Sequence, residues 1–456
     1  MSSIPLAPPR TTPARALLDR QAARESSART YARSLPIVPV RARGASVEGA
    51  DGRRYLDCLS GAGALALGHN HPAVVEAIRA MLDRQAPLQV LDMATPERDA
   101  FVEELFATLP EPLASTGRVH FCSPAGTDAV EAAWKLVQAA TGRSGLLAFT
   151  GAYHGQSCGS LAATANVAVK APVRGVAADV TRLPYPHRYR CPFGLGGDLG
   201  DEVAAGYVRR LLDDPAGGVV APAAMVVEPV QGEGGVVAAP DGWLRAMRAV
   251  TAERGIALVA DEVQTGVGRT GAMWAVDHSG VVPDVLVASK AVGGGLPLAL
   301  IVYREELDGW APGAHTGTFR GNHLAFAAGA ATLRVVREEG LVARAAELGG
   351  RLLADLRRLQ AASPVVGDVR GRGLMVGLEI VDPDGDPDGC GARRPAPALA
   401  RAIRRESLAR GLIVELGGRD DCVVRLLPPL TIADAEVAAV VERLAGAVAA
   451  VGRCRA

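Results

Sequence analysis

The feature that most restricts the fold of this chain is a repeated alternation of short apolar runs with segments of helical periodicity. Each run is apolar at consecutive positions, so both faces of the strand it predicts would be buried, as in a parallel sheet covered by helices. The runs lie at 119–122, 146–149, 224–227, 256–260, 285–288 and 298–302. Strand–helix alternation over this length predicts an α/β fold.

Two other regions flank this alternating part of the chain. Apolar residues between 37 and 59 surround the Asp51-Gly52 turn, which predicts a β-hairpin. Helical patterning dominates 324–359, and a change of composition between 326 and 337 predicts a domain boundary. The C-terminal part then predicts strands at 365–369, 374–380, 412–416 and 423–426 and a final helix at 434–451.

Composition argues against several classes of function. The 49 basic and 49 acidic residues give a formal charge of zero, so bulk charge predicts neither nucleic-acid nor membrane-surface binding. No apolar run is long enough for a transmembrane helix, and the start lacks the apolar segment of a secretory signal. The arginine-rich start would suit a transit peptide, but Asp19 and Glu25 weaken that interpretation. Seven cysteines without a CxxC pair predict reduced thiols in a cytoplasmic protein.

The loop expected at 382–396 matches only half of a calcium-binding motif. Asp384, Asp386, Asp388 and Gly389 fit its first half, but the twelfth position is Pro395, where the motif needs a bidentate glutamate. We therefore expect no metal.

Only three of the 49 basic residues are lysines, and the other 46 are arginines, which cannot act as amine nucleophiles. Lys135 lies in the middle of a predicted helix and Lys170 in a polar connection. Lys290 instead follows the strand predicted at 285–288 and precedes a glycine-rich run. At this end of an α/β strand, a partly buried lysine has a lowered pKa and can form a Schiff base, although a surface lysine in a loop is the alternative.

Asp261 directly follows the strand predicted at 256–260, which places a carboxylate at the same edge of the sheet. A lysine that binds an aldehyde and an aspartate that pairs with a pyridinium nitrogen are the two groups that pyridoxal 5′-phosphate (PLP) requires. Gly126 and Thr127 open a predicted helix whose backbone N–H groups could hold a phosphate. Tyr153 could lie against the cofactor ring. Taken singly, the helix start also fits a generic turn, and Tyr153 also fits ordinary packing.

Together these segments resemble the class III aminotransferases, PLP enzymes of fold type I. They occur in the order of that family: SPAGTDAVEAA, FTGAYHG, VVEPVQGEGG, ADEVQTGVGRTG, ASKAVGGGLPL, GTFRGN and VRLLPPL. The resemblance covers residues 35–450 and implies a large PLP-binding domain at 81–330 with a mostly parallel seven-stranded sheet. It implies a smaller α+β domain built from 35–80 and 331–456, after a mobile N-terminal arm at 1–34 with a short helix.

Four stretches resemble most closely the diaminobutyrate–2-oxoglutarate branch of this family. They are CLSGAGALALGHNHP, PYPHRYRCPFGLGGDLG, WAPGAHTGTFRGN and VGDVRGRGLMVGLE. The stretch at 185–200 is the most distinctive of them, and its residues suggest no catalytic role.

The resemblance also implies a role for each matching residue. Lys290 would form the Schiff base and carry the proton, Asp261 would pair with the ring nitrogen, and Glu228 would support Asp261. Val263 and Tyr153 would pack on the two ring faces, and Gln264 would bind the ring hydroxyl. Gly126, Thr127 and the partner subunit's Thr318 would bind phosphate. His154 belongs to this candidate cofactor-binding set, although, like His69 and His71, it favours a structural role when taken alone.

Glu233 and Arg425 would form a gate. The arginine would bind the α-carboxylate of glutamate or 2-oxoglutarate when Glu233 moves away, with a plain structural ion pair as the alternative. Some ω-aminotransferases carry an arginine where this chain has Gln156, so the second carboxylate must be held elsewhere, and Arg320 is a candidate.

The implied reaction is ping-pong exchange of the terminal amine between L-2,4-diaminobutyrate and 2-oxoglutarate. It gives L-aspartate 4-semialdehyde and L-glutamate through the lysine-bound and amine forms of the cofactor, in a homodimer with shared sites or a dimer of dimers. The alternatives are another ω-aminotransferase (ornithine, lysine or 4-aminobutyrate), a PLP-dependent aminomutase or racemase, and a non-catalytic PLP-binding protein. The amine donor and the pathway stay open.

Overall fold

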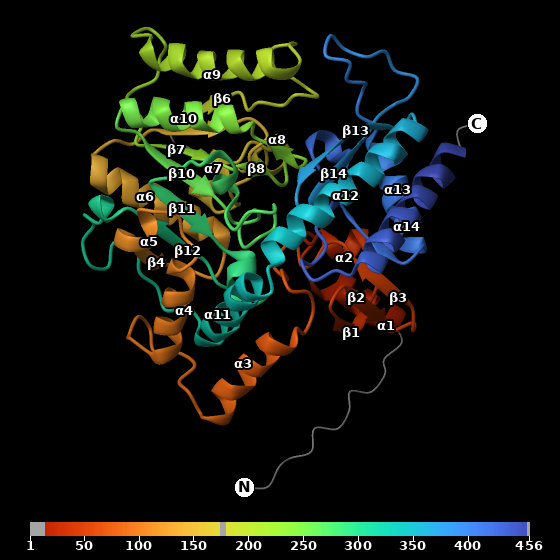
Figure 1. The fold of residues 1–456 in the computed structure, drawn as a ribbon, viewed down its shortest axis with the longest axis horizontal. Helices are drawn as coiled ribbons and strands as arrows, with labels where there is room; N and C mark the ends of the chain where they lie inside the picture. The colour runs from red at the N-terminus through yellow and green to blue at the C-terminus, as the bar shows by residue number, and fades with distance from the viewer. Residues whose placement is uncertain (1–13, 174–178, 454–456) are drawn as a thin grey trace.

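The computed structural model describes residues 14–173 and 179–453. Figure 1 shows a large sheet with its helices on the left of the view and a group of smaller sheets with α12, α13 and α14 on the right. Residues 1–13, the first part of the predicted arm, lie outside the described residues. The described part of that arm forms α1 (Ala14–Arg24) and α2 (Tyr31–Ser34).

The large sheet has seven strands. In spatial order they are β4 (Arg118–Phe121), β12 (Leu300–Tyr303), β11 (Val285–Ala288), β10 (Ala257–Asp261), β7 (Ala224–Val227), β5 (Leu146–Phe149) and β6 (Val180–Leu183). β12 is antiparallel to both of its neighbours, and the pairs among the other strands are parallel. The predicted α/β fold with a mostly parallel seven-stranded sheet is confirmed, and β6 is the strand that the apolar runs did not reveal.

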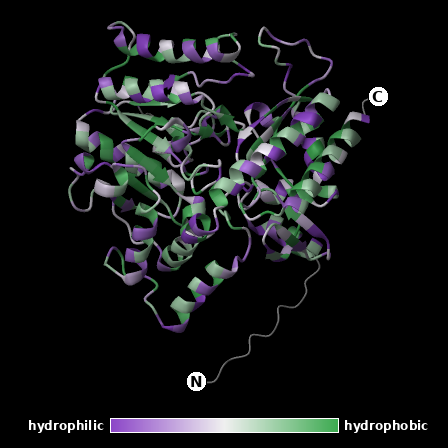
Figure 2. Cartoon of the chain, viewed as in Figure 1, coloured by the Kyte–Doolittle hydropathy of each residue, from purple (hydrophilic) through white to green (hydrophobic). Residues whose placement is uncertain are grey.

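Both faces of this sheet are buried, as the unbroken apolar runs predict. On β7, Val226 belongs to the core cluster under helix α6, and its neighbour Val227 belongs to the cluster on the opposite face. Figure 2 shows the strands as predominantly hydrophobic, whereas outer helices such as α9 carry many hydrophilic residues. The helices around the sheet are α3 (Pro72–Asp83), α4 (Pro96–Phe106), α5 (Leu113–Thr116), α6 (Gly126–Thr141), α7 (Cys158–Ala163), α8 (Val167–Lys170), α9 (Gly197–Asp213), α10 (Asp241–Glu253) and α11 (His323–Glu338), with 3-10 turns η1 (Ala275–Ser279), η2 (Lys290–Gly293) and η3 (Glu305–Leu307).

Smaller sheets are built from both ends of the chain. One contains β1 (Pro39–Arg43), β2 (Ser46–Gly49), β3 (Arg54–Asp57) and β15 (Leu412–Ile413), and another contains β13 (Val366–Arg372), β14 (Met375–Ile380), β17 (Val423–Leu426) and β16 (Glu415–Gly417). A two-stranded ribbon pairs β8 (Val230–Gln231) with β9 (Val237–Ala238). The associated helices are α12 (Leu341–Ala362), α13 (Pro397–Ala409), η4 (Arg419–Asp421) and α14 (Asp434–Arg453).

The prediction of a single strand at 412–416 is wrong in one respect. The strand is divided at Val414, because β15 pairs with β3 and β16 pairs with β17 in a different sheet. The domain boundary expected between 330 and 331 falls inside the continuous helix α11, so we propose that the chain passes from one part to the other through this helix. Within the described ranges, no helix combines the length and apolarity needed to cross a membrane.

Candidate active site

Lys290 begins the 3-10 turn η2, two residues after the last residue of strand β11. Its φ angle of 51° lies in the left-handed region, which a non-glycine residue adopts only when the surrounding structure imposes it, often at functional sites. The side chain borders two cavities that share several lining residues, of about 310 Å³ and 780 Å³. Burial lowers the pKa of Lys290, although the carboxylates of Glu233 and Asp261 oppose this. A larger fraction of this amine is therefore neutral and nucleophilic.

Asp261 is the last residue of β10 and borders the smaller cavity together with Lys290. Its Oδ2 atom lies 2.7 Å from His154 Nδ1, and its Oδ1 atom accepts a hydrogen bond of 3.1 Å from the backbone N–H of Val263. The backbone N–H of His154 is in turn bonded to Thr164 Oγ1 at 2.9 Å. His154 therefore has more than a general packing role, because it holds one oxygen of the carboxylate that faces the cavity.

Glu228 is buried behind the same cavity and holds two backbone segments in place. Its Oε2 atom accepts a hydrogen bond of 3.0 Å from the Tyr153 N–H, and its Oε1 atom accepts one of 3.1 Å from the Gly232 N–H. Burial raises the pKa of Glu228 to about 7, with His154 lowering it and Asp261 raising it. The interaction between Glu228 and Asp261 is thus one of like charge, while the hydrogen bonds of Glu228 position the backbone at Tyr153 and Gly232.

The start of α6 forms a site suited to an anion. Gly126 and Thr127 are its first two residues and border the smaller cavity, and the N-terminus of a helix of this length favours negative charge. Thr127 Oγ1 lies 2.6 Å from Ser157 Oγ and accepts a hydrogen bond from the Ser157 N–H at 3.1 Å. A Cβ atom on Gly155 would come within 2.2 Å of Thr127 Oγ1, so glycine is required at that turn.

Ser157 is a functional candidate that the sequence reasoning missed. It lies three residues after His154, and its hydroxyl also contacts Glu131 and Ser160. The sequence feature that could have pointed to Ser157 is its position two residues after the GAYHG segment.

The smaller cavity fits PLP in size and in the chemistry of its walls. Its volume of about 310 Å³ is at the lower end of the usual range for small-molecule sites. It offers an amine, a carboxylate and a hydroxyl-rich helix start, which match an aldehyde, a ring nitrogen and a phosphate. A Cβ atom on Gly126 would lie 3.0 Å from Val263 Cγ1, so the absence of a side chain there keeps this part of the cavity open. The residues present therefore fit the cofactor.

The residues expected to contact the ring also border this cavity. Val263, Gln264 and Tyr153 are all among its lining residues. Gln264 Nε2 donates a hydrogen bond of 3.2 Å to the Ala62 carbonyl, and its Oε1 atom lies 3.5 Å from Arg425 Nη1. Tyr153 borders both cavities, so it lies between the candidate cofactor site and the larger cavity.

Arg425 is fully buried in the central strand β17 and contacts two carboxylates at once. Its Nη2 atom lies 2.8 Å from Glu233 Oε1 and 2.6 Å from Glu415 Oε2. Burial would lower the pKa of Arg425, but Glu233 and Glu415 outweigh it and raise the pKa. Burial would raise the pKa of Glu233, but Arg425 and Lys290 outweigh it and lower the pKa. The predicted Glu233–Arg425 pair is thus present, in a closed arrangement.

Glu415 is the second functional candidate that the sequence reasoning missed. It lies directly opposite Arg425 in the antiparallel pair β16–β17, and cross-strand neighbours share a face of the sheet. Gly417 makes room for the arginine, because a Cβ atom there would come within 2.6 Å of Arg425 Nε. The sequence predicts both of the strands that carry these residues, but only the pairing register between the strands places Glu415 opposite Arg425.

Thr318 and Arg320 do not border the cavity that contains Lys290. The carbonyl of Thr318 accepts a hydrogen bond of 2.8 Å from Gln89 Nε2, and both residues lie outside the two cavities already described. Arg320 is ion-paired with Asp128. The candidate arginine for a second substrate carboxylate is therefore engaged elsewhere in this chain.

Asp128 also lies close enough to Cys122 and His315 for the three to hold a metal ion. Because Arg320 and His315 both contact its Oδ2 atom, this carboxylate already has cationic and hydrogen-bonding partners. Burial would raise the pKa of Asp128, but these partners hold it well below its ordinary value.

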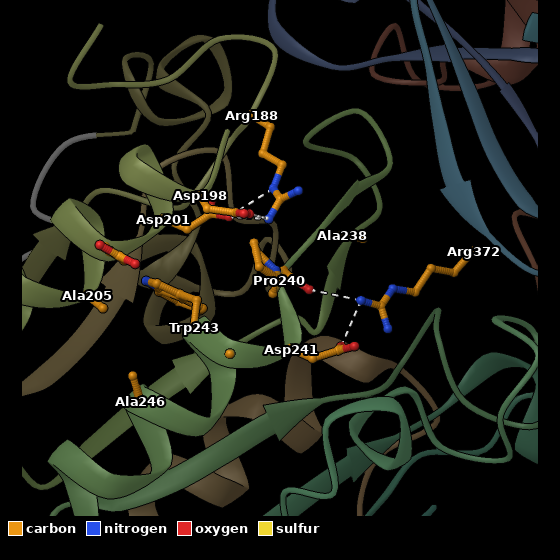
Figure 3. Close-up of a pocket in the computed structure, with 13 residues that line it drawn as sticks. Arg188, Asp198, Asp201, Ala205, Ala238, Pro240, Asp241, Trp243, Ala246 and Arg372 are labelled. Atoms are coloured by element: carbon orange, nitrogen blue, oxygen red, sulfur yellow. Dashed lines mark hydrogen bonds and ion pairs between the residues drawn. The ribbon is translucent and has the colours of Figure 1, made fainter. Parts of the chain in front are cut away.

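A separate cavity of about 640 Å³ lies beside helix α10, away from Lys290 (Figure 3). Arg188 pairs with Asp198 and Asp201, and Arg372 pairs with Asp241. Its arginines are thus held by neighbouring acids, in contrast to the amine of Lys290.

The distinctive stretch at 185–200 borders this cavity and connects it to the active site. The Tyr185 hydroxyl donates a hydrogen bond of 2.8 Å to the carbonyl of Glu228, and Arg190 is ion-paired with Glu379 on β14. This stretch therefore links the large sheet to a smaller one, and its contact with the site is made through the backbone of Glu228.

Comparison with known proteins places the whole chain among aminotransferases. A family model described as aminotransferase class-III matches residues 27–448. A diaminobutyrate–2-oxoglutarate aminotransferase of Rhizobium meliloti (strain 1021) is 53% identical over 96% of this chain and 93% of its own length. One from Haemophilus influenzae is 46% identical over 93% of each chain.

Solved structures agree with this placement. A thermostable (S)-enantioselective omega-transaminase from Thermomicrobium roseum superposes with a TM-score of 0.85 at 30% identity, covering 96% of this chain and 98% of its own. An amine transaminase from an uncultivated Pseudomonas species, solved in a PLP-bound form, gives a TM-score of 0.83 at 31% identity, covering 94% and 98%.

Proposed function

The chain belongs to the class III aminotransferases, and from this premise we propose that it transfers the terminal amine of L-2,4-diaminobutyrate to 2-oxoglutarate. The observation that carries the proposal is the cavity wall that Lys290 shares with Glu233, whose carboxylate is ion-paired with the buried Arg425. The site thus combines the Lys290 amine, which would bind the cofactor, with the Arg425 guanidinium, which would bind a dicarboxylate. The products would be L-aspartate 4-semialdehyde and L-glutamate, and the biosynthetic direction would form diaminobutyrate. The names of the Rhizobium and Haemophilus relatives support this choice of donor.

PLP is the cofactor, and when bound it supplies an aldehyde that condenses with amines and a ring that accepts the electron pair of a deprotonated carbon. We propose that Lys290 Nζ would bind the aldehyde and would carry the proton in the 1,3-transfer between the two carbon atoms on either side of the transferred nitrogen. Asp261, held by His154, would keep the ring nitrogen protonated. The start of α6 with Thr127 and Ser157 would bind the phosphate.

Arg425 has to bind a substrate carboxylate in one half-reaction and Glu233 in the other. In the closed arrangement its Nη2 atom is shared by two glutamates. A dicarboxylate would displace Glu233, whose side chain is 33% exposed and therefore has room to move. A guanidinium is well suited to this exchange because it binds either carboxylate through two parallel hydrogen bonds.

We expect Arg425→Gln to reduce kcat/KM for 2-oxoglutarate by about 100-fold, because charge-assisted hydrogen bonds contribute about 1.5–3 kcal/mol each. The half-reaction with diaminobutyrate, in which Arg425 binds Glu233 instead of a substrate carboxylate, should lose much less. Single-turnover kinetics of the two half-reactions measures the ratio. Arg358→Gln is the matched control and should keep the ratio of the unmodified protein, because this arginine is exposed, pairs with Asp355 and borders neither cavity. An equal loss in both half-reactions would mean that Arg425 has only a structural role.

The experiment that tests the proposed function is a donor screen with the purified protein and PLP. We expect glutamate to form fastest from diaminobutyrate and 2-oxoglutarate, and more slowly from ornithine, lysine or 4-aminobutyrate. Product formation without any keto acid would contradict transamination and favour an aminomutase or racemase. A clear preference for another donor would reassign the substrate and leave the reaction class intact.

We further propose that two copies of the chain form a dimer. The apolar side chains of Leu88, Leu91, Met93 and Phe319 are 49%, 52%, 58% and 69% exposed. The hydrogen bond between Gln89 and Thr318 brings these two segments together. An exposed apolar patch of this kind favours a protein interface. In such a dimer the partner subunit's Thr318 would complete the phosphate site.

Phe319→Asp is expected to convert the dimer to a monomer, because it places a charge in the centre of the patch. Light scattering coupled to gel filtration measures the mass, and PLP occupancy should fall at the same time. Val220→Asp is the matched control, because Val220 is also an exposed apolar residue, at 80%, but lies outside the patch. A Phe319→Asp protein that stays dimeric would rule out this interface.

A further inference from the structure

Glu415 is a buried carboxylate that the established aminotransferase chemistry does not use. Its side chain is only 12% exposed, and it contacts the same Arg425 nitrogen as Glu233 does. Two glutamates therefore face one guanidinium, and the other cation that acts on Glu415 is Lys290, whose amine the proposed function commits to the cofactor. Burial raises the pKa of Glu415; Arg425 lowers it, and the charge of Glu233 raises it again. A buried group in this state is stabilised by a further cation.

Glu415 also faces the space that a substrate has to occupy. It borders the larger cavity together with Lys290, Glu233 and Tyr31, the first residue of α2. Tyr31 and Glu415 line the same cavity, and burial and then the Glu415 carboxylate raise the pKa of the Tyr31 hydroxyl. The N-terminal helix α2 thus forms one wall of the cavity against this carboxylate.

The candidate donors differ in the group that a carboxylate at this position would recognise. Diaminobutyrate, ornithine and lysine each carry a second ammonium group on the carbon that bears their carboxylate. 4-Aminobutyrate has the same carboxylate and reacting amine but no second ammonium group. On the dicarboxylate side, glutamate has a single ammonium group, which is the one that reacts. A spare negative charge in the cavity is therefore complementary only to the diamino acids.

We propose that Glu415, oriented by Arg425 and Tyr31, binds the second ammonium group of a diamino acid donor and selects it over amino acids with a single amine. The inference rests on the proposed function, and it assigns the recognition of the donor to a carboxylate other than Glu233. Glu233 moves to admit a dicarboxylate, whereas Glu415 stays in place opposite Arg425 in the β16–β17 pair. Two glutamates on one arginine thus serve the two half-reactions separately.

The test is Glu415→Gln, which keeps the size of the side chain and removes its charge. We expect the ratio of kcat/KM for diaminobutyrate to kcat/KM for 4-aminobutyrate to fall by about 10- to 100-fold, the range for losing a hydrogen bond to a charged group. The change should appear in KM for the diamino acid. Glu406→Gln on α13 is the matched control, since its carboxylate pairs with Arg410 of the same helix segment, and it should keep the ratio.

An unchanged ratio in Glu415→Gln would overturn the inference. If the unmodified protein rejects diaminobutyrate, the proposed function fails, and the ratio of ornithine or lysine to 4-aminobutyrate then tests Glu415 on its own. Tyr31→Phe is a second variant for the case in which Glu415→Gln binds no PLP. It removes one hydroxyl at a residue that is 45% exposed, so the fold should be retained. A fall in the same ratio would support the inference, and an unchanged ratio would contradict it.

Discussion

Replacing Lys290 with alanine is expected to reduce transamination by at least about 10⁴-fold, because one side chain supplies both the covalent attachment and the proton transfer. No other lysine can substitute for it. Lys135 donates to the Ala314 carbonyl and Lys170 to the Ala162 and Thr164 carbonyls, and neither borders the cavity that contains Asp261. The pKa of Lys290 is lowered, first by burial, which favours the neutral, nucleophilic form of this amine.

Glutamate formation from diaminobutyrate measures the loss of activity, and borohydride reduction followed by peptide mass spectrometry locates the PLP-labelled residue. Lys170→Ala is the matched control. Its two carbonyl partners also accept hydrogen bonds from Arg182, so they stay satisfied when the lysine is removed. A Lys290→Ala protein with a tenth or more of the original activity would show that another group carries the proton.

Asp261→Asn is expected to reduce kcat by about 10²- to 10⁴-fold while PLP stays bound. The amide can still accept a hydrogen bond from His154, but it lacks the charge that keeps a ring nitrogen protonated. The start of α6, Thr127 and Ser157 are untouched by the substitution, so the phosphate site is retained. The effect should therefore appear in the rate of proton abstraction and much less in cofactor affinity.

Single-turnover kinetics with a donor deuterated at the reacting carbon measures that step, and a larger isotope effect is expected in the variant. Asp308→Asn is the matched control, because this aspartate is exposed beside Arg118 and borders neither active-site cavity. An unaffected rate in Asp261→Asn would mean that another group stabilises the ring nitrogen. Loss of PLP would assign Asp261 to cofactor retention instead.

The parts of the fold predicted correctly are those encoded by local apolar runs. β5, β7 and β11 have the predicted bounds, because a strand buried on both faces is apolar at every position. β17 also has the predicted bounds, although Arg425 interrupts its apolar residues. β6 was missed for the opposite reason. It lies at the edge of the sheet, three of its four residues are only partly buried, and two adjacent polar residues interrupt its sequence Val-Thr-Arg-Leu.

The residues of the candidate active site also divide into those that the sequence reveals and those whose contacts only the structure reveals. Lys290 and Asp261 could be found from the sequence because each ends an apolar run, and the carboxyl ends of parallel strands meet at one edge of a sheet. His154, 107 residues away from Asp261, could not be paired with it, since no local pattern records which side chains meet after packing.

The sequence by itself therefore determined the α/β fold and singled out the proposed Schiff-base lysine and the proposed partner of the ring nitrogen, because these depend on local hydrophobicity and on the scarcity of lysine. Only the tertiary structure decided which groups surround Arg425. The register of β16 against β17 places Glu415 opposite it, and the fold of the loop after β8 adds Glu233. The same packing engages Arg320 with Asp128, away from the cavity. Contacts between distant segments arise from how the sheets pack, and a sequence pattern contains no record of that arrangement.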